Sequence, residues 1–96
     1  MTDLVRVEEN PEQTRYEIYV GDALAGIAEY RDTPGQRTMF HTETDPAFRG
    51  RGLASTLAAA ALDDVRARGL ALAPTCPFIR AFVEQHPEYA DLVRQS

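Results

Sequence analysis

The stretch from residue 45 to residue 69 constrains the fold more strongly than any other part of this 96-residue chain. It predicts one long helix over about 52–68, because apolar residues recur there at helical spacing and form a single stripe. The stripe consists of Leu53, Leu57, Ala60, Ala61 and Val65. Gly69 follows as a stop signal just beyond the last turn. A helix with one apolar stripe must bury it, and we expect this helix to lie on a sheet.

The loop that leads into this helix carries positive charge where most helices carry negative charge. Unpaired backbone N–H groups give a helix N-terminus partial positive charge, which favours Asp and Glu in the first turn. Here Arg49 and Arg51 alternate with Gly50 and Gly52. Glycine leaves room for a ligand to approach the bare N–H donors. The segment therefore predicts a site for a negatively charged ligand, and phosphate or pyrophosphate fits it.

Three phosphate-binding patterns can be compared with this loop. The Walker A spacing is absent, and the dinucleotide-binding fingerprint fails because Ser55 stands where that fingerprint needs Gly or Ala. The pattern that fits is Arg/Gln-x-x-Gly-x-Gly/Ala, with Arg49, Gly52 and Ala54 at its fixed positions. The segment thereby resembles the acetyl-CoA pyrophosphate loop of the GNAT superfamily of acyltransferases. An ordinary glycine-containing loop that caps a helix is the alternative.

Composition narrows the class of protein. The chain is 44% hydrophobic and 26% charged, which is typical of one globular domain. A net charge of -5 argues against non-specific binding to nucleic acid. The single cysteine, Cys76, excludes an internal disulfide and a cysteine-based zinc site. No apolar run has the length of a membrane span, and the N-terminal MTDLVRVEEN lacks the layout of a signal peptide, so we expect a cytoplasmic location and no membrane partner.

Segments on both sides of the long helix predict the strands of a sheet. Turn signals at Gly21-Asp22 and Pro34-Gly35 indicate an antiparallel meander before the helix. The segment after the helix predicts a strand parallel to the last strand of the meander, which gives one right-handed β-α-β crossover. Pro77 suits the first position of a second helix, and 87–93 predicts a final helical turn or two. The expected strands are 4–7, 15–20, 24–30, 38–44 and 70–73.

The strand at 38–44 is unusually polar for a central strand. Alternation places His41 and Glu43 on one face, with Asp45 beyond them, and Phe40, Thr42 and Thr44 on the other face. Polar side chains on a central strand are costly unless something polar uses them. This end of the strand is therefore expected to line a cleft.

Several separated runs of sequence resemble a single family. In chain order they are NPEQTRYEIYV, GIAEY, TETDPAFRGRGLASTL, RARGL, CPFIRAF and HPEYADLV. Together they resemble the short, single-domain GNAT-like N-acetyltransferases. The resemblance implies an α/β (α+β) fold with three layers over residues 1–96. Its parts would be a mixed sheet of about five strands, mostly antiparallel with one parallel β-α-β crossover, and a C-terminal helix.

The resemblance also assigns roles to residues. It implies acetyl-CoA, or coenzyme A, as the cofactor, with the pantetheine arm in a gap beside the strand segment of Thr42, Glu43 and Thr44. The pyrophosphate would bind the N–H groups of the loop, which belong to Arg49, Gly50, Arg51, Gly52, Leu53 and Ala54. By this resemblance, the short family lacks the helical insertion and the C-terminal hairpin that shape the amine pocket of larger relatives, so the acceptor stays open.

Candidate catalytic residues follow from what acetyl transfer to an amine requires. The amine must be neutral, and the departing thiolate must be stabilised or protonated. Glu43 is the first candidate base because it lies on the cofactor strand, and His41 on the same face is the second. The alternatives are a solvated or salt-bridged strand carboxylate for Glu43 and an exposed strand histidine for His41. A metal site from His41, Glu43 and Asp45 is not expected, because Asp45 belongs to the turn with Pro46.

Cys76 is a candidate of a different kind. It precedes Pro77 at a helix start, where the helix dipole favours thiolate, and the resemblance places this helix beside the end of pantetheine. Cys76 could protonate the departing thiolate, accept the acetyl group covalently, or only pack against the cofactor as a small buried thiol. Tyr89, in the run HPEY, is another candidate proton donor, with packing again as the alternative.

The function predicted on these grounds is acetyl-CoA-dependent N-acetylation of a primary amine by direct transfer. The acceptor is expected to be a small molecule or a protein amine, and the acidic composition favours a basic acceptor such as a polyamine or a lysine side chain. The alternative is a non-catalytic module that binds CoA or acetyl-CoA on the same scaffold. The oligomeric state stays open between monomer and homodimer.

Overall fold

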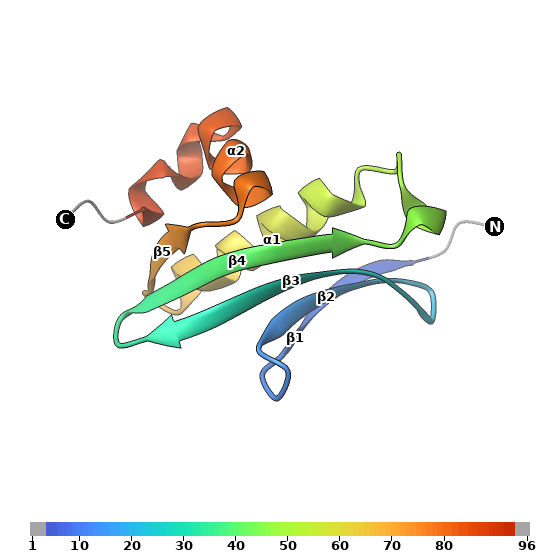
Figure 1. Ribbon diagram of the computed structural model, residues 1–96, viewed down its shortest axis with the longest axis horizontal. Helices are drawn as coiled ribbons and strands as arrows, with labels where there is room; N and C mark the ends of the chain where they lie inside the picture. The colour runs from blue at the N-terminus through green and yellow to red at the C-terminus, as the bar shows by residue number, and fades with distance from the viewer. Residues whose placement is uncertain (1–3, 94–96) are drawn as a thin grey trace.

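The computed structural model describes residues 4–93 and has a twisted sheet with helices packed against it (Figure 1). The strands are β1 (Val5–Asn10), β2 (Arg15–Val20), β3 (Ala23–Thr33), β4 (Gln36–Thr44) and β5 (Ala71–Pro74). The helices are α1 (Leu53–Ala67) and α2 (Pro77–Gln85), with the 3₁₀ helices η1 (Pro46–Phe48) and η2 (Pro87–Leu92). Strands lie in chain order and are antiparallel, except that β4 and β5 are parallel. The expected meander and the crossover through α1 are confirmed.

Three strands are longer than the sequence predicts. β1 continues through Glu8 and Glu9 to Asn10, because all three residues pair with β2. β3 ends later and β4 begins earlier than expected, so Pro34 and Gly35 alone form the turn between them. The sequence-based prediction ended β1 too early because two charged residues, Glu8 and Glu9, follow Val7. At a sheet edge such residues can pair through the backbone while their side chains stay near solvent.

Both helices cover the same face of the sheet. α1 and α2 contact each other and contribute to one hydrophobic core. The other face carries exposed side chains, among them Phe40, His41 and Glu43, and we call it the open face. Within the described residues the fold therefore has two layers, and the expected third layer is wrong. The five-stranded mixed sheet with a C-terminal helix is confirmed.

The apolar stripe of α1 anchors this helix on the sheet. Leu57, Ala61 and Val65 are buried as predicted, whereas Ala60 is only partly buried and Leu62 is fully buried instead. The sheet side chains in the same core include Tyr16, Ile18, Ala28 and Met39. None of the helices between residues 4 and 93 combines the length and the apolar character needed to cross a membrane. This packing fixes α1, and with it the loop that precedes it.

β4 contains a bulge that changes which residues share a face. Glu29 of β3 pairs with His41, but the next residue of β3 pairs with Met39, so Phe40 is an extra residue in β4. Met39 and Thr42 both lie on the helix-covered face although they are three positions apart, which strict alternation does not allow. The predicted grouping of Phe40 with Thr42 is therefore wrong, while the opposite placement of Thr42 and His41 is confirmed.

A buried arginine fastens the β3–β4 turn to α1. The Arg37 side chain is 4% exposed and donates two hydrogen bonds, of 2.8 and 2.9 Å, to the carboxylate of Asp32. It also donates to the hydroxyl of Tyr16 at 2.7 Å and lies 3.6 Å from the carboxylate of Asp64 in α1. Its guanidinium stacks on the ring of Tyr30. Because the cations and carboxylates in this cluster satisfy one another, we interpret it as structural.

Candidate functional site

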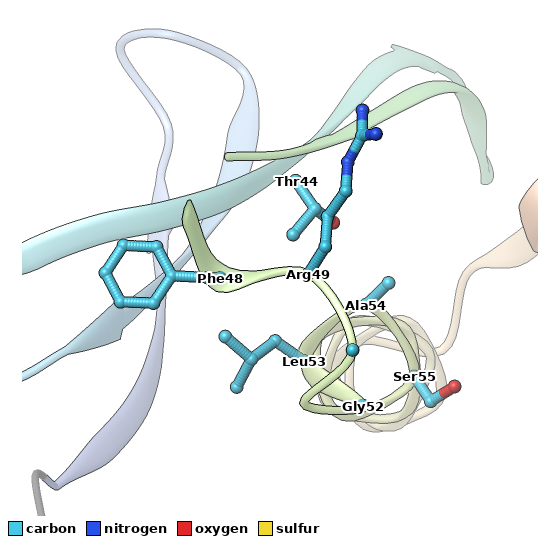
Figure 2. Close-up of a pocket in the computed structure, with 8 residues that line it drawn as sticks. Thr44, Phe48, Arg49, Gly52, Leu53, Ala54 and Ser55 are labelled. Atoms are coloured by element: carbon cyan, nitrogen blue, oxygen red, sulfur yellow. The ribbon is translucent and has the colours of Figure 1, made fainter. Parts of the chain in front are cut away.

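The loop between β4 and α1 encloses an open cavity of about 340 Å³. η1 begins the loop, and Asp45 caps it by accepting a hydrogen bond of 2.9 Å from the N–H of Ala47. Gly50 and Gly52 follow with φ angles of 83° and 72°, which non-glycine residues rarely adopt. The residues that line the cavity are Thr44, Phe48, Arg49, Gly50, Gly52, Leu53, Ala54 and Ser55 (Figure 2).

The N-terminus of α1 opens into this cavity. Gly52 is the N-cap and offers no side-chain hydrogen bond, and the N–H of Thr56 bonds the carbonyl of Gly52 at 3.1 Å. The N–H groups of Leu53, Ala54 and Ser55 precede that bond and have no partner within the helix. A side chain built at Gly50 or Gly52 would meet no heavy atom within 4 Å. The free N–H groups and the open space fit an anion such as a pyrophosphate.

The two arginines of the loop are placed differently. Arg49 lines the cavity, and Figure 2 shows its side chain extending past Thr44 and away from the axis of α1. Arg51 does not line the cavity, and its guanidinium lies 5.3 Å from the centre of the Phe48 ring. Within residues 4–93 neither arginine forms a salt bridge with a carboxylate. Their positive charge is therefore available to a ligand.

The gap that pantetheine is expected to occupy begins where β4 and β5 separate. Their pairing ends at Met39 and Pro74, and the N–H of Cys76 then donates to the carbonyl of Met39 at 3.0 Å. Beyond this point β5 does not pair with β4. The hydroxyl of Thr42 lies 3.7 Å from the sulfur of Cys76, which is buried at the N-cap of α2. The structure therefore brings Thr42 and Cys76 together beside the unpaired edge of β4.

The two candidate bases lie on the open face. The side chains of His41 and Glu43 are 46% and 64% exposed, and His41 Nε2 lies 3.6 Å from a carboxylate oxygen of Glu43. Glu29 of β3 is beside them. Asp45 is not part of this group, because its carboxylate caps η1. β4 thus presents Thr42 to the helix-covered face and the candidate bases to the opposite face.

Tyr89 lies apart from these residues. Its hydroxyl donates a hydrogen bond of 2.9 Å to Asp63 of α1, and its ring packs against Phe82. Burial and the bond to the Asp63 carboxylate both raise the pKa of Tyr89. A tyrosine held in this way joins η2 to α1, with its hydroxyl engaged by Asp63.

Sequence reasoning missed Gly26 and Glu29. Gly26 pairs with Thr44, and a side chain there would come within 2.8 Å of the carbonyl oxygen of Glu43. Gly26 therefore lets β3 approach β4 closely. A glycine inside a strand is a known sign of such an approach, so this signal was present in the sequence. Glu29 could only be found once the register with β4 was known.

The fold and the site define a class: a small α+β scaffold in which a loop with free backbone N–H groups leads into α1, beside two parallel strands that separate. Residues 15–92 match the family described as GCN5-related N-acetyl-transferase. The chain is 32% identical over 85 residues to Protein NATD1 of Xenopus tropicalis, covering 86% of this chain and 78% of the relative. It is 31% identical over 93 residues to Protein NATD1 of Danio rerio, covering 93% of this chain and 84% of the relative.

A solved structure supports the same conclusion about the fold. The solution structure of a GCN5-like protein from Staphylococcus aureus has a TM-score of 0.73 at 19% identity, covering all (100%) of this chain and 93% of the other. At this identity the likeness concerns the fold. With the match over residues 15–92, it follows that the chain belongs to the GCN5-related N-acetyltransferase family, a family of acetyltransferases.

Proposed function

We propose that this protein transfers an acetyl group from acetyl-CoA directly to a primary amine. The observation that carries the proposal is that the cavity at the start of α1 and the unpaired edge of β4 lie next to each other. A cavity with free backbone N–H groups at the N-terminus of α1 adjoins the end of β4, whose edge is unpaired by β5 beyond Met39. A ligand with a pyrophosphate at one end and an extended arm at the other fits this shape.

The chain's own residues fit the two ends of acetyl-CoA. The N–H groups at the start of α1, together with Arg49, would hold the pyrophosphate, and Arg51 in the same loop would add positive charge. The unpaired backbone of β4 near Thr42 and Thr44 would hold the arm, with Cys76 beside its end. Bound acetyl-CoA supplies an activated thioester, and the amine nitrogen takes over the acetyl group.

The amine must lose a proton, and the open face provides acceptors for it. The carboxylate of Glu43 takes this proton, directly or through water, and His41 at 3.6 Å can relay it to solvent. Both side chains are exposed, so an amine can reach them from outside. Holding donor and amine together can lower the barrier by about 7 kcal/mol, so the base need not be strong.

An arm bound along the edge of β4 would bring the departing sulfur to the helix-covered side of this strand. The thiol of Cys76 is a group that carries a proton there, since it lies beside Thr42 at the start of α2. It can donate that proton to the departing thiolate and regain one from the solvent. Cys76 acts in this proposal as a donor or a packing surface, and the acetyl group does not pass through it.

A binding module without catalysis is the second candidate. The observation that favours it is the exposure of His41 and Glu43 on an open face, where water competes with an acceptor amine. Such a module would bind acetyl-CoA with the same loop and release it unchanged.

Release of free CoA from acetyl-CoA, measured with polyamines, lysine peptides and small primary amines, tests the proposal. We expect turnover with at least one acceptor, and Glu43→Gln should lower kcat by about 10²-fold or more while acetyl-CoA affinity stays unchanged. Glu12→Gln, at an exposed turn position, is the matched control and should keep full activity. Turnover at background with every acceptor, together with tight acetyl-CoA binding, would favour the binding module.

A further inference from the structure

Three side chains of the open face converge although they come from two strands. Glu29 lies directly opposite His41 in the β3–β4 register, and Glu43 is two residues farther along β4. One donor atom from each of the three lies within 4.8 Å of the other two. We call this set the open-face triad. Cross-strand neighbours and alternate residues of one strand share a face, so the backbone itself holds the three donors together.

The bulge at Phe40 creates this convergence. Met39 is completely buried beneath the helices, so strict alternation would turn His41 toward the core. The extra residue restores His41 to the open face, beside Glu29 and Glu43. Bulges often re-aim a side chain next to a functional site. The imidazole is thereby presented outward on rigid strands.

Between residues 4 and 93 no arginine or lysine forms an ion pair with Glu29 or Glu43, and the one close contact of this kind is His41 with Glu43 at 3.6 Å. Glu29 and Glu43 are two carboxylates, and His41 is the one nitrogen ligand between them. The neighbouring arginines are engaged elsewhere: Arg15 donates to Glu17 at 2.8 Å, and Arg31 stacks over the ring of Phe40. A cation that binds the triad would therefore find two negative charges and a donor nitrogen already assembled.

The ligand types identify the class of cation. Imidazole and carboxylate together suit zinc and similar first-row divalent ions, whereas magnesium prefers oxygen ligands only. Three protein ligands with water in the remaining positions is the arrangement of open zinc sites. Exposed strands leave room for that water. An ion of this kind needs only a small closure of donors that already lie within 4.8 Å.

We propose that Glu29, His41 and Glu43 bind one divalent transition-metal ion of the zinc class. The sequence did not predict this site, because its third ligand comes from the neighbouring strand and not from Asp45. The ion also has a consequence that rests on the proposed acetyl transfer. A carboxylate of Glu43 bound to zinc cannot take the proton of the amine, so zinc inhibits the reaction.

Calorimetric titration of zinc chloride into the full, tag-free chain tests the binding. We expect one ion per chain, and no comparable heat with magnesium chloride. Loss of even a supporting partner of a metal ligand costs about 10–100-fold in affinity, so His41→Ala and Glu29→Gln should each weaken binding by about tenfold or more. His86→Gln is the matched control, since His86 is also exposed and also lies near a glutamate, at 3.8 Å from Glu88.

The control and a second readout make the outcome decisive. Cobalt bound in place of zinc should give a visible absorption spectrum without a thiolate band, because Cys76 is not a ligand. Equal zinc affinity in the wild type and His41→Ala, or an equal loss in His86→Gln, would overturn the proposal. The binding measurement does not depend on turnover. If the protein binds zinc but transfers no acetyl group, the metal site stands. Only the inhibitory role of zinc and the proposed enzyme activity are then wrong.

Discussion

Gly26 shapes the site by having no side chain. The position of its missing Cβ is 2.8 Å from the carbonyl oxygen of Glu43, and a backbone atom cannot move aside as a flexible side chain does. We expect Gly26→Ala to displace the end of β4. The free energy of unfolding should fall by about 1–3 kcal/mol, as in other overpacked sites, and acetyl-CoA affinity should fall as well.

The control for this prediction is Gly35→Ala. Gly35 also requires glycine, because its φ is 75°, but it has open space around it and lies in the turn at the other end of β4. Gly35→Ala should lower stability while acetyl-CoA affinity in the folded protein stays unchanged. Equal affinity for acetyl-CoA in both variants would contradict the role that we assign to Gly26.

Cys76 allows the direct and the covalent routes to be separated. Its sulfur is buried at the start of α2 and contacts Thr42 beside the unpaired edge of β4, where we propose that pantetheine binds. Direct transfer predicts that incubation with acetyl-CoA leaves the mass of the intact protein unchanged, and that Cys76→Ser keeps measurable turnover. An added acetyl group that Cys76→Ser abolishes, seen by mass spectrometry, would instead establish a covalent intermediate.

At the scale of helices and strands, the sequence predicted the features that depend on local periodicity. The stripe of α1, the start of α2 at Pro77 and the strand order all follow from signals within a few residues of one another. The loop before α1 depends on local signals too, since Arg49, Gly50 and Gly52 are consecutive or nearly so. A cavity is present there, whereas Arg51 is not among its lining residues, and anion binding by the loop stays a prediction.

Features that depend on register between strands could not be predicted. The bulge at Phe40 exists because Met39 and Thr42 must both reach the helix-covered face, and no local signal in 38–44 marks it. Glu29 joins His41 through the same register. The number of layers also escaped prediction, because it depends on which face α2 covers after β5 ends.

At the scale of the whole molecule, the Arg37 cluster ties β1, β2, β3 and α1 together. Hydrogen bonds from Arg37 lower the pKa of Asp32. Burial alone would raise the pKa of Asp64, but the hydrogen bonds from Tyr16 and Arg68 outweigh it and lower this pKa as well. In the unfolded chain both carboxyl groups bind protons more readily. Their contribution to stability is therefore present above about pH 4 and is lost as the pH falls through the lowered pKa values.

The tyrosines of this cluster determine where folding stability is lost at alkaline pH. Burial and the hydrogen bond to Glu9 raise the pKa of Tyr30 to about 12, and burial likewise raises the pKa of Tyr16. Their contribution is present below the ordinary tyrosine pKa near 10 and is lost as the pH rises through the raised values. The free energy of unfolding, measured with urea between pH 2 and pH 11, should form a plateau at intermediate pH and fall at both ends of this range. A profile that stays flat down to pH 2 would contradict this account.

Arg37 itself provides a test of the cluster that is independent of pH. Its side chain is almost completely buried, and its removal leaves Asp32 and Glu9 without their common partner. We expect Arg37→Met to lower the free energy of unfolding by about 3 kcal/mol or more. Arg6→Met, which removes a half-exposed arginine from β1, should change the free energy of unfolding far less. The same small effect for both variants would show that the cluster is not structural.

The central claim is that the loop before α1 holds the pyrophosphate of acetyl-CoA, and calorimetric titration of acetyl-CoA tests it most directly. One charged hydrogen bond is worth about 1.5–3 kcal/mol, so Arg49→Ala should weaken binding by about tenfold or more, and the double variant Arg49→Ala/Arg51→Ala at least as much. Arg6→Ala removes the same charge from β1 and should bind like the wild type. Micromolar binding that depends on Arg49 is the result that we predict. No binding to the wild type, or equal binding in Arg49→Ala, would contradict the account.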